Sequence, residues 1–132
     1  MRPVIIFSNQ KGGCGKTTTS REVSLYTASL GRKVCIIDSD PQGNLTKSLV
    51  SEDDIVSGLY EALNNQSFEL MEVNEHLWLL AGDRRLASLE KSLIGEMDAF
   101  TRLKDLLNKD GDIFGDFDYI FIDSPPSLGI LT

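Results

Sequence analysis

The chain has 132 residues, which is enough for one domain of ordinary size and too few for two. Hydrophobic residues make up 41% and charged residues 25%, a composition that is typical of folded globular proteins and excludes a disordered or fibrous chain. The net charge of −7 is uneven: residues 1–50 carry seven Lys/Arg against three Asp/Glu, so an anion is expected to bind there, whereas residues 51–132 are strongly acidic and do not favour DNA binding.

The first predicted element is a β-strand buried on both faces, Val4–Phe7, because the run is continuous, apolar and mostly β-branched. This run is too short for a membrane span or for the core of a signal peptide, so we expect a cytoplasmic protein without a membrane partner. A Gly-rich loop follows. A helix is predicted from Lys16 to Leu30, with Gly31 placed for a left-handed C-terminal cap.

A second buried strand is predicted at Val34–Ile37, and it ends at Asp38. Residues 4–38 therefore contain a strand, a loop, a helix and a strand, which is the order of a βαβ unit. The crossover of such a unit is right-handed in nearly all known cases, and its two strands are parallel. A parallel sheet is the expected framework.

Further elements alternate between helix and strand patterns. After a Pro/Gly turn at residues 41–44, the apolar spacing over residues 55–63 predicts one helix that ends at Asn64–Asn65. Residues 77–81 predict a third strand.

Two amphipathic helices are expected at residues 86–93 and 97–107, separated near Gly95. Residues 119–122 form a fourth predicted strand, which ends at Asp123. The expected fold class is α/β, with a mostly parallel sheet flanked by helices in one domain.

The loop between the first strand and the first helix has the composition of a phosphate-binding loop, KGGCGKT at residues 11–17. Glycines let successive backbone N–H groups approach an anion, and the following helix N-terminus adds partial positive charge. Lys16 can reach the β- and γ-phosphates, Thr17 offers a hydroxyl ligand to Mg²⁺, and Thr18 can donate to a more proximal phosphate. The strict pattern begins with Gly, and this sequence departs from it with Gln10-Lys11.

Three separated motifs resemble the ParA family of bacterial plasmid and chromosome partition ATPases. They are SNQKGGCGKTTT at residues 8–19, DSDPQGN at residues 38–44 and DSPPSLG at residues 123–129. The resemblance extends over essentially the whole chain. It implies a P-loop NTPase fold of the deviant Walker A class, ATP and Mg²⁺ as cofactors, and ATP-driven dimerisation as the switch for partitioning.

The resemblance also implies the roles of individual residues. Catalysis is expected from Lys11, Lys16 and Asp40. Lys11 matches the family's extra lysine, which reaches across a nucleotide-sandwich homodimer to the partner's ATP, and a solvated surface lysine is the alternative. The residues expected to contact nucleotide are Lys11, Gly12, Gly13, Cys14, Gly15, Lys16, Thr17 and Thr18.

Three aspartates follow the predicted strands. Because a parallel sheet binds ligands at the carboxyl ends of its strands, Asp38, Asp40 and Asp123 are expected to converge on the phosphate site. Asp123 and Thr17 are expected to hold Mg²⁺, with Asp38 supporting the metal, and Asp40 resembles the first-switch aspartate that orients the attacking water. A turn or capping aspartate is the alternative for each.

Members of the family are much longer chains, so residues 1–132 are expected to be the N-terminal part of a single, truncated ParA-like domain. The family's other half carries much of the adenine pocket and the basic residues that bind DNA nonspecifically, and a ParB-like partner stimulates hydrolysis. Loss of a neighbouring strand would leave the phosphate-loop strand at an open edge. A nonhydrolytic nucleotide-binding module and a MinD-like ATPase are the alternatives, and Asp40–Asn44 favours the partition branch.

Overall fold

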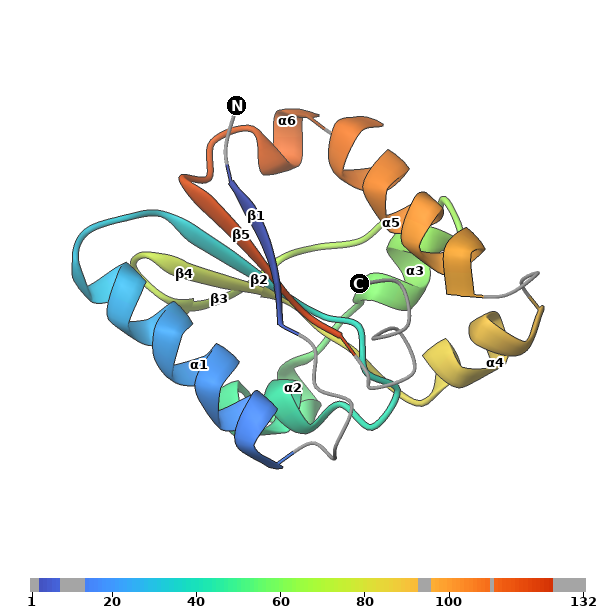
Figure 1. Cartoon of the computed structure of the whole chain (residues 1–132), viewed down its shortest axis with the longest axis horizontal. Helices are drawn as coiled ribbons and strands as arrows, with labels where there is room; N and C mark the ends of the chain where they lie inside the picture. Colours follow the sequence, from blue (N-terminus) through green and yellow to red (C-terminus); the bar gives the residue numbers. More distant parts are fainter. Residues whose placement is uncertain (1–2, 8–13, 93–95, 110, 125–132) are drawn as a thin grey trace.

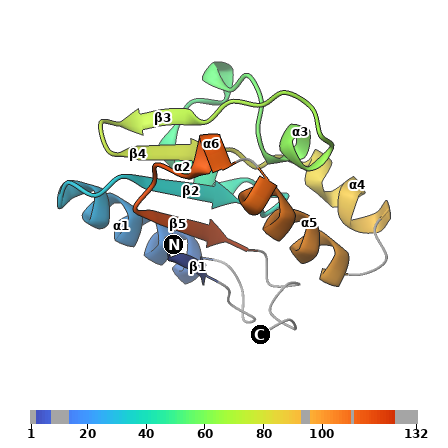
Figure 2. The ribbon, with the colours of Figure 1, turned by 90° about the horizontal axis from the view of Figure 1, so that it is seen from above.

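The computed structural model describes residues 3–7, 14–92, 96–109 and 111–124. A five-stranded sheet with the order β1-β5-β2-β4-β3 forms its centre (Figure 2). Its first four members in that order are parallel, and the last is antiparallel to its neighbour. The strands are β1 (Val4–Phe7), β2 (Val34–Asp38), β3 (Met71–Asn74), β4 (Leu77–Leu80) and β5 (Tyr119–Asp123). The expected α/β class with a mostly parallel sheet is confirmed.

Helices cover both faces of the sheet (Figure 1). One face carries α1 and α2, and the other carries α3, α4, α5 and α6. Among the described helices, none is long and apolar enough to cross a membrane. The helices are α1 (Cys14–Ser29), α2 (Asn44–Leu49), α3 (Leu59–Leu63), α4 (Arg85–Ser92), α5 (Glu96–Lys109) and α6 (Gly111–Phe114), with a 3₁₀ turn at Glu52–Asp54.

Strand β2 lies at the centre of the core, because all five of its residues are buried. Val34 and Ile36 pack on the side of α1 and α2, whereas Cys35 and Ile37 pack on the side of α3, α4 and α5. Burial of one such aliphatic side chain contributes about 1.5–3 kcal/mol to folding. The unbroken apolar pattern of this strand therefore reflects cover on both faces.

Strand β3 was not predicted, because it is short and its residues alternate between core and solvent. It is a short edge strand in which Met71 and Val73 pack against the core while Glu72 and Asn74 are exposed. Its pairing with β4 also shifts register between Glu72 and Asn74. A search for continuous apolar runs misses an alternating, four-residue strand of this kind.

The prediction of one helix over residues 55–63 is wrong in its first half. Helix α2 forms immediately after the turn, Ile55 to Gly58 is not helical, and α3 begins only at Leu59. At Gly58 the backbone approaches the end of β4 so closely that a Cβ would lie 2.3 Å from the Ala81 carbonyl oxygen. The Leu59 N–H donates to that same oxygen over 2.8 Å, so the chain docks on the sheet before the helix starts.

Other helix limits were predicted well. Helix α1 ends two residues before Gly31, which takes a φ of +87°. Helix α3 ends at Leu63, with Asn64 as its C-cap and Asn65 following at a φ of +59°. Two amphipathic helices, α4 and α5, lie where the apolar spacing placed them. The short helices α2 and α6 were not predicted.

Strand β1 lies at the edge of the sheet, where its described neighbour is β5. The expected open edge at the phosphate-loop strand is therefore observed, but the expected burial of this strand on both faces is wrong. Val4, Ile5 and Ile6 keep 45%, 42% and 37% of their surface exposed. These side chains have the apolar composition of a central strand but lie at an edge of the described sheet.

Candidate functional site

The ends of three parallel strands form one row at the carboxyl edge of the sheet. Asp123 at the end of β5 is in register with Phe7 of β1 on one side and with Asp38 of β2 on the other. Residues two positions earlier, Ile36 and Phe121, pack beneath α1 and α2. Because side chains in one row of a parallel sheet share a face, Asp38 and Asp123 lie on the face that carries α1.

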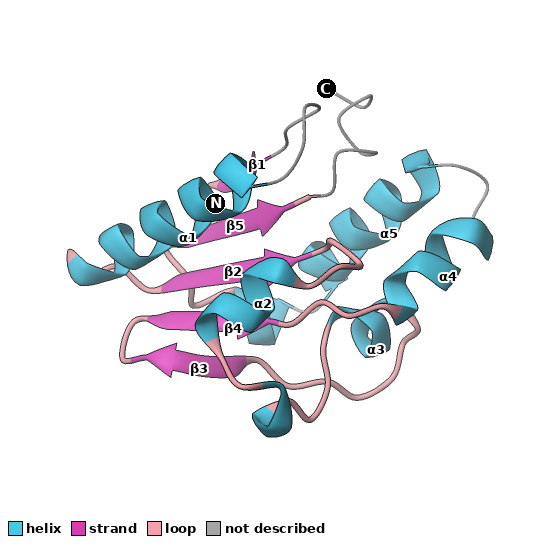
Figure 3. Cartoon of the chain, turned by 90° about the horizontal axis from the view of Figure 1, so that it is seen from below, coloured by secondary structure: helices cyan, strands magenta, loops and turns pink. Residues whose placement is uncertain are grey.

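The predicted phosphate loop connects this edge to α1. Lys11, Gly12 and Gly13 lie outside the described residues, as does most of the segment 123–129 after Ser124. The backbone of residues 14–18 forms the first turn of α1, and their side chains, those of Cys14, Lys16, Thr17 and Thr18 included, lie outside the described part. Figure 3 shows the N-terminal end of α1 on the side toward which β5 and β2 point.

Asp38 is a fully buried carboxylate with three hydrogen-bond donors. Its Oδ2 accepts from the backbone N–H of Thr46 over 3.0 Å and from the Thr46 hydroxyl over 2.7 Å. Its Oδ1 accepts from the Asp40 N–H over 3.1 Å. Burial raises the pKa of Asp38 to about 6; the bonds from Thr46 oppose this rise, and the charge of Asp123 adds to it.

Asp123 is 1% exposed, so the site holds two buried acids side by side. Burying like charges together is unfavourable unless a proton or a cation compensates them. Oxygen donors of this kind suit Mg²⁺, which binds through one or two carboxylates and completes its shell with water and phosphate oxygens. Within the described ranges, no group of three or more His, Cys, Asp or Glu forms a metal cage, and Mg²⁺ does not require one.

Asp40 belongs to a tight turn that follows β2. Its Oδ1 accepts from the Gln42 N–H over 2.9 Å, and its carbonyl oxygen accepts from the Gly43 N–H over 3.0 Å. Gly43 takes a φ of +65°, in the region that favours glycine. Asp40 is only partly buried, and its N–H donates to the buried Asp38 carboxylate.

Two residues at this site, Thr46 and Gly82, were not predicted from the sequence. Thr46 is 1% exposed, and its hydroxyl oxygen accepts from the Gly82 N–H over 3.0 Å while the hydroxyl donates to Asp38. The available signals were a hydroxyl residue two positions after the second motif and a glycine directly after the third predicted strand. Neither pattern reveals a contact across 36 positions of sequence.

A cleft of about 500 Å³ borders the turn that contains Asp40, and Pro41 and Gln42 line it. Its walls include Gly43 and Thr46 on one side and Gly82 and Arg85 on the other. Arg85 forms ion pairs of 2.8 Å with both Asp83 and Glu61, and its guanidinium lies 4.3 Å from the centre of the Tyr60 ring.

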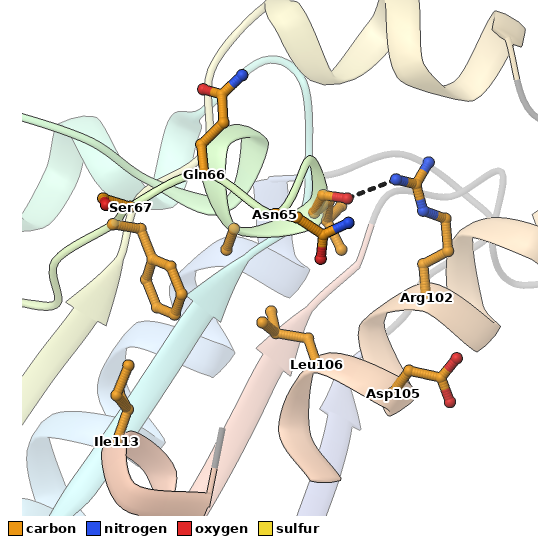
Figure 4. A pocket seen from close by; sticks show the side chains of 10 residues that line it. Asn65, Gln66, Ser67, Arg102, Asp105, Leu106 and Ile113 are labelled. Carbon is orange, nitrogen blue, oxygen red and sulfur yellow. Dashed lines mark hydrogen bonds between the residues drawn. The ribbon is translucent and has the colours of Figure 1, made fainter. Parts of the chain in front are cut away.

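Another cleft, of about 620 Å³, lies on the opposite face of the sheet among α3, α5 and α6 (Figure 4). Figure 4 shows Asn65 and Arg102 on either side of it, and Arg102 donates to the carbonyl oxygen of Leu63. The sheet separates this cleft from the face that carries Asp38 and Asp123, so it is not part of the candidate site.

Comparison with known proteins gives a consistent result. A family model described as an AAA domain matches residues 2–132. The chromosome partitioning protein ParA of Myxococcus xanthus is 39% identical over 98% of this chain and 46% of its own length. The sporulation initiation inhibitor protein Soj of Bacillus subtilis is 36% identical over 100% of this chain and 53% of its own length. The chain spans about half the length of the curated relatives it matches.

Solved structures show the same architecture. A cobyrinic acid a,c-diamide synthase from Mycobacterium smegmatis with a bound ATP analogue and magnesium is 37% identical, with a TM-score of 0.82 over 99% of this chain and 54% of that one. A putative plasmid partition protein from Borrelia burgdorferi bound to AMPPNP is 28% identical, with a TM-score of 0.76 over 96% and 55%.

Proposed function

Because this chain belongs to the AAA-domain family and is similar to the ParA and Soj partition proteins, we propose that it binds ATP with Mg²⁺ at the carboxyl edge of the sheet. The observation that carries the proposal is the pair of buried carboxylates, Asp38 and Asp123, in one row with the strand that leads into the predicted phosphate loop. A proton or a cation can compensate two buried acids that share one edge, and Mg²⁺ bound together with phosphates at the predicted loop would supply the cation.

Residues 11–18 would bind the phosphates through backbone N–H groups and through Lys16. Thr17 and Asp123 would hold Mg²⁺, with Asp38 supporting the site. Bound there, Mg²⁺ would neutralise charge on the phosphate oxygens. Asp40 would orient the water that attacks the γ-phosphate, and Lys11 of a second copy would neutralise the charge that develops as the phosphoryl group departs.

In the wider proposal, ATP-dependent pairing of two copies is the switch that drives partition of a chromosome or plasmid. Residues 1–132 would be part of one ATPase domain, and a ParB-like stimulating partner and nonspecific DNA binding would belong to the longer assembly. The names of the ParA and Soj relatives support this role.

A second candidate is a nucleotide-binding module without turnover. It is favoured by one observation: the chain spans about half the length of its curated relatives. Such a module would keep the phosphate and Mg²⁺ contacts and would not pair with the second copy whose Lys11 assists hydrolysis.

ATP turnover and nucleotide binding, measured together, separate the candidates. Lys16→Ala should lose both, whereas Asp40→Ala should keep binding and lose turnover. Matched controls are Lys104→Ala and Asp54→Ala, because both side chains are exposed. Binding without turnover in the parent chain would favour the second candidate. Absence of binding in the parent chain would refute both.

Sedimentation of the parent chain then tests pairing. ATP with Mg²⁺ should double the mass of the parent and of Asp40→Ala, and should leave the mass of Lys16→Ala unchanged. A monomer in every condition would refute the ATP-dependent dimer for this chain.

A further inference from the structure

The Thr46 side chain connects two segments that are far apart in the sequence. Its hydroxyl donates to Asp38 Oδ2 over 2.7 Å, and the same oxygen accepts from the backbone N–H of Gly82 over 3.0 Å. The Thr46 N–H also donates to Asp38 Oδ2, over 3.0 Å. Thr46, Asp38 and Gly82 are all buried, so water does not replace these bonds.

Gly82 packs closely against the backbone of Asp38 and Asp40. A Cβ at Gly82 would lie 2.4 Å from the Asp38 carbonyl oxygen and 3.1 Å from the Asp40 carbonyl oxygen. The Asp38 side chain also binds the backbone of Asp40, because its Oδ1 accepts a hydrogen bond from the Asp40 N–H. The start of the Asp40 turn is therefore held by the Asp38 side chain and by the backbone after β4.

We propose that Thr46 is a positioning residue: it fixes the Asp38 carboxylate and the Gly82 backbone together, and through them it sets the place of Asp40. The inference rests on the proposed function, because it gives Asp40 a reason to be held. Thr46 acts through Asp38 and Gly82. It is assigned no contact with the nucleotide.

The linked hydrogen bonds from the Gly82 N–H through the Thr46 hydroxyl to Asp38, which we call the relay, predict a specific pattern of kinetic effects. Without the hydroxyl, Asp38 Oδ2 loses its shortest donor and the Gly82 N–H loses its acceptor, so the Asp40 turn gains freedom relative to the sheet. A misplacement of about 1 Å at a reacting group can lower a rate by about 100-fold. Binding of the phosphates depends on other residues, so the affinity for ATP should change much less than the turnover rate.

Thr46→Val removes the hydroxyl and keeps the branched shape, whereas Thr46→Ser keeps the hydroxyl. We expect Thr46→Val to lower kcat by about 10-fold or more with KM for ATP within about 3-fold of the parent. Thr46→Ser should restore most of the rate. Ser48→Ala is the matched control, because Ser48 lies in the same helix and its hydroxyl donates to the Leu45 carbonyl. A Thr46→Val enzyme with parental kcat would overturn the proposal.

A second measurement does not depend on turnover or on the folding of a variant. Hydrogen exchange of the Gly82 amide in the parent chain should slow when ADP and MgCl₂ are added, because the relay connects this amide to the site. The His76 amide, which donates to Asn74 Oδ1 over 2.8 Å and lies at the opposite end of β4 from Gly82, should not respond. Bound ADP that leaves Gly82 exchange unchanged would overturn the relay alone. A parent chain that fails to bind ADP or ATP would instead refute the proposed function, and the inference with it.

Discussion

Asp38 should make the stability of this protein depend on pH in a direction opposite to that of an ordinary paired carboxylate. Burial raises its pKa from the usual 3.8 to about 6 in the folded state. Between these two values the folded chain holds a proton that the unfolded chain releases. The free energy of unfolding therefore falls as pH rises through this window, and the contribution is complete below 3.8 and lost above 6.

The size of the effect follows from the two pKa values. One pKa unit is worth about 1.4 kcal/mol, so the rise corresponds to about 3 kcal/mol in total. About 2 kcal/mol of this should be lost between about pH 4.5 and pH 7. Glu61 and Asp83 give stability the opposite pH dependence. Burial raises the pKa of each carboxyl, but the hydrogen bonds from Arg85 outweigh burial and lower it. Their contributions to the free energy of unfolding are therefore lost as pH falls.

Comparison of the parent with Asp38→Asn isolates this one group. Urea unfolding can be followed by the fluorescence of Trp78, the single tryptophan, which lies 5.8 Å from the Phe117 ring. The stability of Asp38→Asn relative to the parent should increase by about 2 kcal/mol from about pH 4.5 to pH 7. Asp54→Asn, at an exposed position, controls for the loss of one negative charge. A difference between parent and Asp38→Asn that stays constant across this range would refute the reasoning.

Three further predictions concern the framework. Gly82→Ala should lower the free energy of unfolding in urea by about 2 kcal/mol or more, because its Cβ would lie 2.4 Å from the Asp38 carbonyl oxygen. Gly31→Ala is the control, because Gly31 has a φ of +87° and open space around it. This substitution should cost only about 1 kcal/mol. Arg85→Met removes two ion pairs of a half-exposed guanidinium, so it should cost about 1 kcal/mol or less, and the cost should shrink in about 1 M NaCl; a cost that does not change with salt would contradict the assignment. The Pro3 carbonyl accepts from the Ile120 N–H and the Phe7 carbonyl accepts from the Ser124 N–H, so the N–H groups of Val4 and Ile6 point away from β5. NMR should therefore find faster amide exchange at Val4 and Ile6 than at Ile5 and Phe7. Equal exchange rates would argue against an open edge.

The sequence predicted the strands that consist of a continuous apolar run and missed the strand that alternates between apolar and polar residues. Residues 34–37 and 119–122 lie within β2 and β5, because a short, continuous apolar run is typical of a strand that is covered on both sides. Strand β3 alternates between core and solvent, and it was missed for that reason. The helix expected over residues 55–63 shows a second limit, since the apolar period continues through Gly58 while the backbone there is docked on Ala81.

The candidate site was predictable to the extent that topology determines it. Asp38 and Asp123 end parallel strands, so their proximity follows from the sheet alone. The raised pKa of Asp38 and the role of Thr46 could not be predicted in the same way. Both depend on side chains that meet only after α2 and the residues following β4 are packed together.

The proposed function requires that Asp38 and Asp123 form part of a site for nucleotide together with Mg²⁺. Equilibrium binding of ATP to the parent and to Asp123→Asn, each with MgCl₂ and with EDTA, tests this requirement. Mg²⁺ should strengthen binding to the parent, and Asp123→Asn should lose this gain while retaining the weaker, Mg²⁺-independent affinity. Parent affinity that is equal in MgCl₂ and in EDTA, or a full Mg²⁺ gain in Asp123→Asn, would contradict it.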